Sequence, residues 1–144
     1  MAEVSSVVIY HNPGCGTSRN VLELLQAAGY APTVVEYLQT GWTRAQLLGL
    51  FAAAGVSARQ ALRVSKTPAE AMGLTDPAVT DEALITAMVA HPVLVNRPFV
   101  CTARGVRLCR PSELVLDLLD RLPPGPFAKE DGQVIVDAQG ERVL

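Results

Sequence analysis

Apolar and polar positions in the first forty residues follow a strand, helix, strand pattern. The β-branched run SVVIYH at 6–11 is bounded by NPG, which predicts a buried strand. From 18 to 28 the apolar residues share one broad helical face, and Gly29 follows as a stop signal, so we expect a helix there. PTVVEYL at 32–38 predicts a second strand. Because a helix joins these two strands, they are expected to be parallel.

The middle of the chain, from about 43 to 91, is predicted to be helical. Four stretches carry helical patterns with polar starts, at 43–55, 57–62, 67–72 and 80–91. Thr43 and Thr80 are the expected N-caps of their helices, and Gly55 is an expected stop. Pro68 stands where a helix tolerates proline, at its first position.

The last third of the chain returns to β-branched residues. We expect strands near 99–102 and 106–109, joined by a turn at ARG, to form a hairpin. SELVLDLLDRL at 112–122 predicts a helix capped by Ser112.

The chain ends in a segment whose pattern fits two structures. PPGP interrupts the sequence before the tail that starts at 127, and this tail fits either a small hairpin or a short helix. No internal repeat is visible, and PPGP lies too late to separate a second domain. We therefore predict one domain over 1–144.

Composition excludes several classes of protein. The chain has 144 residues, a net charge of −2 and no basic footprint, which argues against nucleic-acid binding. No stretch approaches the roughly 18 apolar residues of a membrane helix, and the N-terminus lacks the basic region of a signal peptide. Three cysteines are an odd, sparse set that fits a reducing compartment, so a cytoplasmic location is expected. No bound metal or cofactor is expected.

The strongest chemical signal is YHNPGCGTSRN at 10–20. Cys15 is expected in the loop that enters the first helix, where unpaired N–H groups and the helix dipole stabilise a thiolate or bind an oxyanion. Gly14 and Gly16 would let backbone amides approach closely, and Ser18 would cap the helix or donate to the sulfur. The alternative, a small buried hydrophobe, fits poorly with these polar, glycine-flanked surroundings. A β-α-β start with a cysteine at its first turn is typical of thioredoxin-like folds.

A helix end alone is too weak to make this thiol a thiolate. Bringing a thiol pKa down into the neutral range requires about 3.4 kcal/mol of preference for the anion. A helix terminus supplies ~0.3–1 kcal/mol, and at most ~2 kcal/mol. A nearby cation is therefore expected, and His11 and several arginines are candidates.

Two arginines precede prolines at the ends of β-like segments, in NRP at 96–98 and LCRP at 108–111. Proline bars the helical conformation for the residue before it, so Arg97 and Arg110 are expected to be extended, and either bond could be cis. Taken alone, both could be solvated surface arginines.

Four motifs together resemble one family. HNPGCGTSRN, LR at 62–63, HPVLVNRP at 91–98 and GVRLCRPSE at 105–113 resemble, in order and spacing, the glutaredoxin-coupled arsenate reductases. The resemblance runs from about residue 7 to the C-terminus, and includes FAKEDG and GERVL. It implies an α/β, thioredoxin-like fold, a mixed four-stranded sheet flanked by helices, with a helical insertion at about 43–91.

The same resemblance implies the site residues. The catalytic residues would be Cys15, as the nucleophile, and His11. The oxyanion would be bound by Arg63, Arg97 and Arg110, for two of which Arg59 and Arg107 are the nearby alternatives. The supporting residues would be Asn12, Gly14, Gly16, Thr17 and Ser18.

The implied reaction is the reduction of arsenate to arsenite, with glutathione as co-substrate and glutaredoxin as partner, through a thioarsenate on Cys15. The motif CGTS lacks a second cysteine, so the electrons are expected to come from outside the chain. Cys101 and Cys109 would lie on the two hairpin arms, not directly opposite each other. An intramolecular disulfide relay is therefore disfavoured.

Other functions remain as alternatives. A regulator of the Spx type shares this fold and binds RNA polymerase through a redox CxxC, but Ser18 stands at the position of the second cysteine. A monothiol glutaredoxin would have a similar CGFS motif, but lacks the Arg-Pro motifs. A general glutathione-dependent thiol oxidoreductase is the third alternative.

Overall fold

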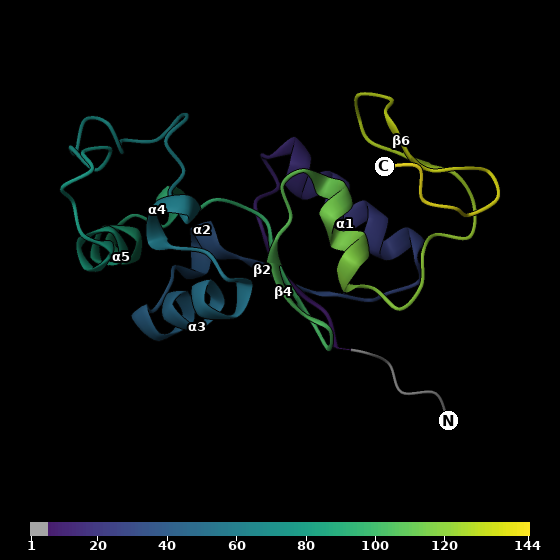
Figure 1. Ribbon diagram of the computed structural model, residues 1–144, viewed down its shortest axis with the longest axis horizontal. Coiled ribbons are helices and arrows are strands. Elements are labelled where there is room, and N and C mark those ends of the chain that lie inside the picture. The colour runs from purple at the N-terminus through teal and green to yellow at the C-terminus, as the bar shows by residue number, and fades with distance from the viewer. Residues whose placement is uncertain (1–5) are drawn as a thin grey trace. The chain divides into compact units, whose positions relative to one another are not determined.

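The computed structural model describes residues 6–144, which form two compact units (Figure 1). The first unit joins the N-terminal part of the chain, up to Glu36, with Arg97–Leu144. The second unit is Tyr37–Asn96 and contains the whole predicted helical insertion. This division into units does not test the expectation of one domain over 1–144, which stays a prediction.

The first unit is built on a four-stranded mixed sheet with the order β2-β1-β3-β4. Its strands are β1 (Val8–His11), β2 (Thr33–Glu36), β3 (Phe99–Thr102) and β4 (Gly105–Leu108). β1 and β2 are parallel, and β3 is antiparallel to both β1 and β4. The parallel pair and the hairpin predicted from the sequence are thus confirmed.

The second predicted strand ends earlier than its β-branched pattern indicated. β2 stops at Glu36, and Tyr37 opens a short helix, α2 (Tyr37–Thr40). Tyr37 is fully buried in the second unit, with its ring 5.1 Å from the ring of Trp42. The prediction of a strand through 38 was wrong: Tyr37 packs against Trp42 in the second unit instead of continuing the sheet.

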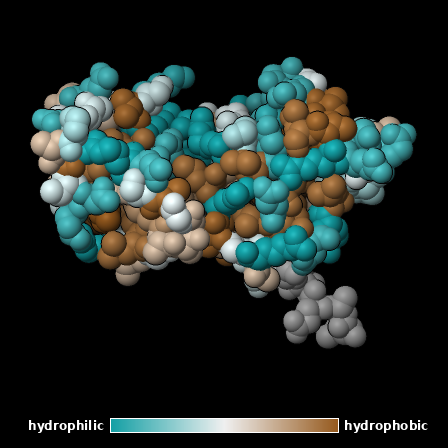
Figure 2. Space-filling view, viewed as in Figure 1, coloured by the Kyte–Doolittle hydropathy of each residue, from teal (hydrophilic) through white to brown (hydrophobic). Residues whose placement is uncertain are grey.

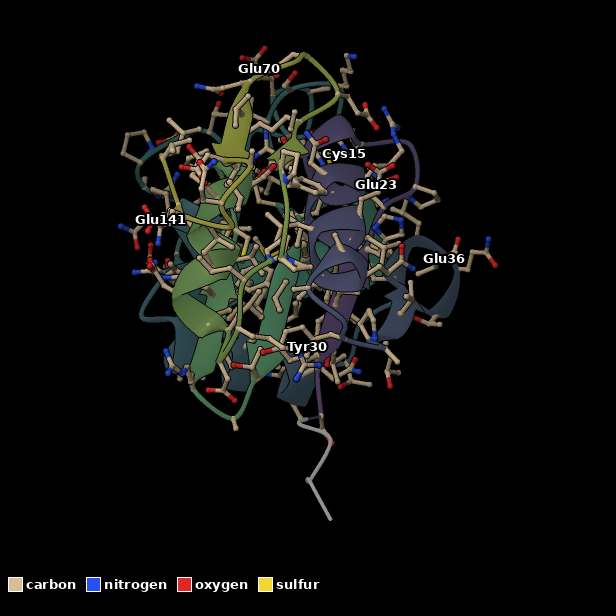
Figure 3. All side chains as sticks on the ribbon, turned by 90° about the vertical axis from the view of Figure 1, so that its right-hand side faces the viewer. Cys15, Glu23, Tyr30, Glu36, Glu70 and Glu141 are labelled. Atoms are coloured by element: carbon tan, nitrogen blue, oxygen red, sulfur yellow. The ribbon has the colours of Figure 1, made fainter. Side chains whose placement is uncertain are left out.

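Helix α1 (Gly16–Ala27) follows β1 and begins two residues earlier than predicted, with Cys15 at the N-cap position. Ser18 therefore lies inside the helix and does not cap it. At the other end, Gly29 adopts a positive φ of 90° and donates its N–H to the Gln26 carbonyl, while Tyr30 N–H reaches Leu25. This is a Schellman ending, which confirms Gly29 as the stop. Cys15 and Tyr30 mark the two ends of α1 in Figure 3.

The segment after the hairpin is a 3₁₀ helix, η2 (Ser112–Leu118), which lies beside α1 (Figure 1). The predicted Ser112 cap was wrong, since Pro111 holds the N-cap position without a side-chain cap. Ser112 is instead turned towards α1, where its Oγ donates to the Thr17 carbonyl at 3.3 Å. Val115 and Leu116 join the apolar face of α1 in one core.

The tail of the chain forms a hairpin, which decides between the two predicted structures. β5 (Phe127–Ala128) pairs antiparallel with β6 (Val134–Val136). Ile135 and Val136 are fully buried in the core shared by α1 and η2. The C-terminal hairpin is therefore part of the first unit's core.

The second unit contains three of the four predicted helical segments. They are α3 (Arg44–Ala54), α4 (Ala58–Ala61) and α5 (Asp81–Ala90), with a 3₁₀ turn, η1 (Pro92–Leu94), after them. Thr43 and Thr80 cap their helices, and Gly55 ends α3 in the left-handed conformation. These three predictions are confirmed.

The fourth segment, at 67–72, forms consecutive turns rather than a helix. Thr67 Oγ1 donates to the carbonyls of Arg63 and Val64 and accepts from Ala69 N–H. This side chain competes with a helical start by satisfying the backbone locally. The helix predicted from Pro68 was therefore wrong.

The surface mixes hydrophobic and hydrophilic residues, which alternate in patches on the face shown in Figure 2. Within residues 6–144, every helix is too short or too polar to cross a membrane.

Candidate active site

A short loop carries Cys15 from the end of β1 to the start of α1. Asn12 shapes this loop, because its carbonyl accepts from Cys15 N–H at 3.0 Å and its Oδ1 accepts from Gly14 N–H at 2.8 Å. A Cβ on Gly14 would lie 3.2 Å from that Oδ1, so the loop has little room for a larger residue. The Cys15 side chain, only 6% of it exposed, sits where helix α1 has unpaired N–H groups.

The sheet register brings Arg97 and Arg110 to this same end of the first unit. Phe99 pairs with both Tyr10 and Leu108, so Arg97, two residues before β3, and Arg110, two residues after β4, lie near the end of β1. Arg110 Nη1 lies 3.7 Å from Cys15 Sγ and also donates to the Arg97 carbonyl at 3.1 Å. Both Arg-Pro bonds are cis, one of the options left open by the sequence.

The electrostatics around Cys15 favour its thiolate. Burial raises the pKa of the thiol, but a hydrogen bond from the Ser18 backbone amide and the positive charges of Arg97 and Arg110 outweigh it, so the pKa lies below its usual value. The N-terminus of the helix and the two cations thus lower the thiol pKa together. This agrees with the expectation that a helix terminus alone is too weak to do so.

His11 is buried and uncharged at neutral pH. Burial lowers its pKa, the Arg19 charge lowers it further, and Glu36 opposes both. Its Nδ1 lies 2.6 Å from Ser18 Oγ, which also accepts from Asn12 N–H at 3.1 Å. The cations beside the sulfur are therefore arginines, and His11 instead holds the loop to the first turn of α1. Its assignment as a catalytic residue stays a prediction.

The remaining predicted residues of the loop connect α1 to its neighbours. The Thr17 carbonyl accepts from Ser112, and Ser18 is fully buried between His11 and the loop. Gly16 has Glu130 and Arg19 within 4 Å of where its Cβ would be, so the helix start is closely covered.

Arg63 belongs to the second unit, and its assignment as the third oxyanion ligand stays a prediction. It follows α4, where its N–H donates to the Leu94 carbonyl at 2.7 Å and its Nε to the Ser65 carbonyl at 3.0 Å.

The two alternative arginines have other partners. Arg59 donates to three carbonyls within the second unit, those of Leu74, Asp76 and Val79. Arg107 forms an ion pair with Asp117 on η2. The choice of Arg63 and Arg110 over these two alternatives stays a prediction.

The other two cysteines are poor nucleophiles. Cys101 pairs with Val106 across the hairpin, so it is not opposite Cys109, as predicted. Burial raises the pKa of Cys101, and it raises that of the fully buried Cys109 to about 12. All three cysteines are free thiols. Within residues 6–144, no three His, Cys, Asp or Glu side chains are grouped to hold a metal ion.

Sequence reasoning missed one ion pair at this site. Arg19 donates to both carboxylate oxygens of Glu130, at 2.8 and 2.9 Å, and its Nη1 donates to the Pro13 carbonyl at 2.9 Å. The only hints in the sequence were an arginine four residues after Cys15 and the unexplained FAKEDG segment.

Comparisons with known proteins point to one family. The ArsC family matches residues 10–118. An arsenate reductase of Synechocystis sp. is 64% identical over 137 residues, covering 95% of this chain and 98% of that protein. An arsenate reductase of Escherichia coli is 49% identical over 140 residues, covering 97% and 99%.

The comparison with solved structures confirms the predicted fold class. A structure described as an arsenate reductase from Vibrio cholerae matches with a TM-score of 0.77 and 39% identity, over 81% of this chain and 100% of that one. A structure described as a putative arsenate reductase from Yersinia pestis matches with a TM-score of 0.73. With the mixed four-stranded sheet and its helices, the fold is thioredoxin-like.

Proposed function

This chain belongs to the ArsC family, and we propose that it is an arsenate reductase that forms arsenite with electrons from glutathione and a glutaredoxin. The observation that carries the proposal is the environment of Cys15. Its sulfur lies at the N-cap of α1, 3.7 Å from the Arg110 guanidinium and under the positive charge of Arg97. This arrangement provides both a nucleophile and a place for an oxyanion.

Arsenate is a tetrahedral oxyanion, and the groups that stabilise the thiolate also suit its binding. The forked guanidinium groups of Arg97 and Arg110 each offer several N–H donors, which match the spacing of arsenate oxygens. The N–H groups at the start of α1 add further positive potential. Arg63 is proposed as the third arginine of this set.

In the first chemical step, the Cys15 thiolate attacks arsenic. A sulfur–arsenic bond forms, and an arsenic-bound hydroxyl takes a proton from solvent and leaves as water, giving a thioarsenate in which arsenic is still As(V). The arginines stabilise the charge that moves onto the remaining oxygens. His11 keeps Ser18 and the loop in place during this step, since its Nδ1 is bound to the Ser18 hydroxyl.

The reduction needs two external thiols. Glutathione replaces a second arsenic oxygen, which leaves as water. A glutaredoxin thiolate then attacks the glutathione sulfur, and the pair of electrons of the sulfur–arsenic bond stays on arsenic, which becomes As(III). The other product is a disulfide between glutaredoxin and glutathione. Hydrolysis of the Cys15–arsenic bond releases arsenite and restores the thiol.

The other cysteines support external rather than internal electrons. A resolving cysteine must react as a thiolate, and burial holds the pKa of Cys109 at about 12 and raises that of Cys101. Glutathione is kept reduced in the cytoplasm, which is the compartment that this chemistry suits. No tightly bound cofactor or metal is part of the scheme.

Phosphate is expected to bind without reacting. It has nearly the same shape and charge as arsenate, so the arginines hold both anions. Phosphorus(V) offers no comparable two-electron reduction by thiols, so the chemistry at Cys15 provides the selection.

Arsenite production by the purified protein tests the proposal. Arsenate, glutathione and glutaredoxin are supplied together, and each is omitted in turn. We expect turnover only with all three, and none with Cys15→Ser. Equal turnover with thioredoxin and its reductase in place of glutathione and glutaredoxin would overturn the assigned electron source. Reduction of a glutathione mixed disulfide without any arsenite formation would favour the general thiol oxidoreductase instead.

A further inference from the structure

The C-terminal hairpin reaches the start of helix α1 through one bidentate ion pair. Glu130, in the turn between β5 and β6, accepts from Arg19 Nε at 2.8 Å and from Arg19 Nη2 at 2.9 Å. Such a forked contact fixes the planes of both groups. The Glu130 N–H also donates to Asn20 Oδ1 at 3.0 Å, so the same residue is attached to α1 twice.

Arg19 carries this attachment on to the reactive loop. Its third nitrogen, Nη1, donates to the carbonyl of Pro13, two residues before Cys15. A Cβ on Gly16 would lie 3.5 Å from Glu130 Oε1 and 3.7 Å from Arg19 Nη2, so the pair covers the residue immediately after Cys15. The pair therefore lies close to the chain on both sides of Cys15, with its one hydrogen bond to this loop at Pro13.

The charges in this arrangement are unusual for a helix start. A cation in the first turns of a helix faces the positive end of the dipole and is unfavourable there. Glu130 offsets the charge of Arg19, and the first turn of α1 contains no acidic residue of its own. The N–H groups beside Cys15 are thus left for the thiolate and its substrate.

We propose that Arg19 and Glu130 form a positioning pair, in which Arg19 fixes the Pro13 carbonyl and the Cys15 loop while Glu130 balances the Arg19 charge beside the sulfur. The inference rests on Cys15 as the nucleophile of the proposed function. Neither residue needs to touch the substrate.

Opposite effects of the two residues on Cys15 distinguish this role from simple structural support. Glu130→Gln leaves the Arg19 charge unbalanced near the sulfur, so more thiolate forms at a given pH. Arg19→Gln leaves the Glu130 carboxylate unbalanced, so less thiolate forms. If the two substitutions only loosened the loop, both would change the amount of Cys15 thiolate in the same direction.

Other charged groups around the sulfur and the pair stay in place in these variants. They are Arg97 before β3, Arg110 after β4, Glu36 at the end of β2 and Glu23 on α1, and the titratable His11 at the end of β1 is uncharged at neutral pH.

The test is the pH profile of Cys15 alkylation by iodoacetamide, followed on the Cys15 peptide by mass spectrometry. At neutral pH we expect the rate to rise about two- to threefold in Glu130→Gln and to fall by a similar factor in Arg19→Gln, as for one charge in a solvated site. The double variant should return close to the wild-type profile. Arg104→Gln, which breaks the similarly exposed Arg104–Asp120 pair elsewhere in the first unit, should change nothing.

A separate readout concerns the position of the loop. We expect Arg19→Gln to lower kcat for arsenite formation by about tenfold, because a small displacement of a nucleophile has a large effect on rate. Unshifted alkylation profiles, or shifts of the same sign in both single variants, would overturn the positioning pair. Because alkylation needs no arsenate, this outcome is separate from any failure of the proposed reaction.

Discussion

Among single residues, the contact between Arg110 and Cys15 gives the most direct prediction. Arg110→Ala removes both a hydrogen bond to the sulfur and a positive charge, so the pKa of Cys15 rises and less thiolate is present at neutral pH. A nearby cation commonly changes thiolate formation by a factor of ten or more, so we expect at least about a tenfold slower alkylation of Cys15 at neutral pH. The KM for arsenate should rise as well.

Arg107→Ala is the matched control for that substitution. Arg107 lies three residues earlier in the same segment, but its partner is Asp117. We expect this variant to lose some stability and to keep the Cys15 alkylation rate. If Arg107→Ala slowed alkylation as much as Arg110→Ala, the assignment of the two arginines would have to be exchanged.

His11 gives a pH dependence of stability. Its pKa in the folded protein lies below its usual value of 6.5, mainly because it is buried. The unfolded chain therefore binds a proton more readily, and the free energy of unfolding falls as the pH drops below about 6.5. His11→Asn keeps a group able to bond Ser18 but cannot titrate, so it should lose this dependence.

Urea unfolding at pH 7.5 and 5.5 measures the effect. Wild type should lose stability between these two values, and His11→Asn should lose less. The same substitution at the exposed His91 should behave like wild type. An unchanged slope in His11→Asn would show that the imidazole is not the group responsible.

The residues of the site differ in how far the sequence could indicate them. The sequence indicates Cys15 through its flanking glycines, and Arg97 and Arg110 through the prolines that follow them. These signals are readable because they come from residues adjacent in the chain. Glu130 lies 111 positions from Arg19, and nothing in FAKEDG shows which cation it will meet. A contact of this kind depends on the fold and is invisible until the hairpin is placed.

At the scale of elements, the two ends of α1 are held by different means, and the C-terminal end can be tested by glycine substitution. Gly29 has a positive φ of 90°, and a Cβ there would lie 3.4 Å from Arg121 Nε, which donates to the Ala28 carbonyl. Gly29→Ala should therefore lower stability by about 1–2 kcal/mol.

Gly49 provides the opposite case on helix α3. It lies in the helix interior with open space around its would-be Cβ. Gly49→Ala should stabilise the protein by about 0.5–1 kcal/mol, because alanine loses less entropy in a helix. Chemical denaturation of both variants checks the pair. If both variants were less stable than wild type, the backbone conformations of Gly29 and Gly49 would not explain the effects of these substitutions on stability.

The elements that the sequence predicted well are those with local signals at their ends. Thr43 and Thr80 satisfy N–H groups three residues away, so their patterns are readable in the chain itself. Ser112 also carries a hydroxyl, but this hydroxyl donates to the carbonyl of Thr17, almost a hundred positions earlier. The helix at 112–122 was predicted too long and of the wrong type, since the structure has a 3₁₀ helix that ends at Leu118, where Thr102 on β3 donates to the last carbonyl.

At the scale of the whole molecule, the three free cysteines differ in their pKa and in their place in the fold. Cys15 has a lowered pKa, Cys101 lies on the strand that pairs with β1 at Val8, and Cys109 is fully buried in the core. Of the three, only Cys15 has a lowered pKa, and it is the thiol on which the proposed reaction depends. Cys101→Ser should therefore retain most of the turnover with glutathione and glutaredoxin.

Cys109 needs a more careful substitution, because a serine hydroxyl buried in the core would lose the hydrogen bonds that it makes to water in the unfolded chain. Cys109→Ser is expected to be active but less stable, by about 1–3 kcal/mol. Cys109→Ala avoids the buried hydroxyl and should keep both turnover and more of the stability. If Cys109→Ala folded normally but formed no arsenite, Cys109 would be a resolving thiol. The electrons would then pass through a disulfide inside the chain, and the requirement for glutathione would be lost.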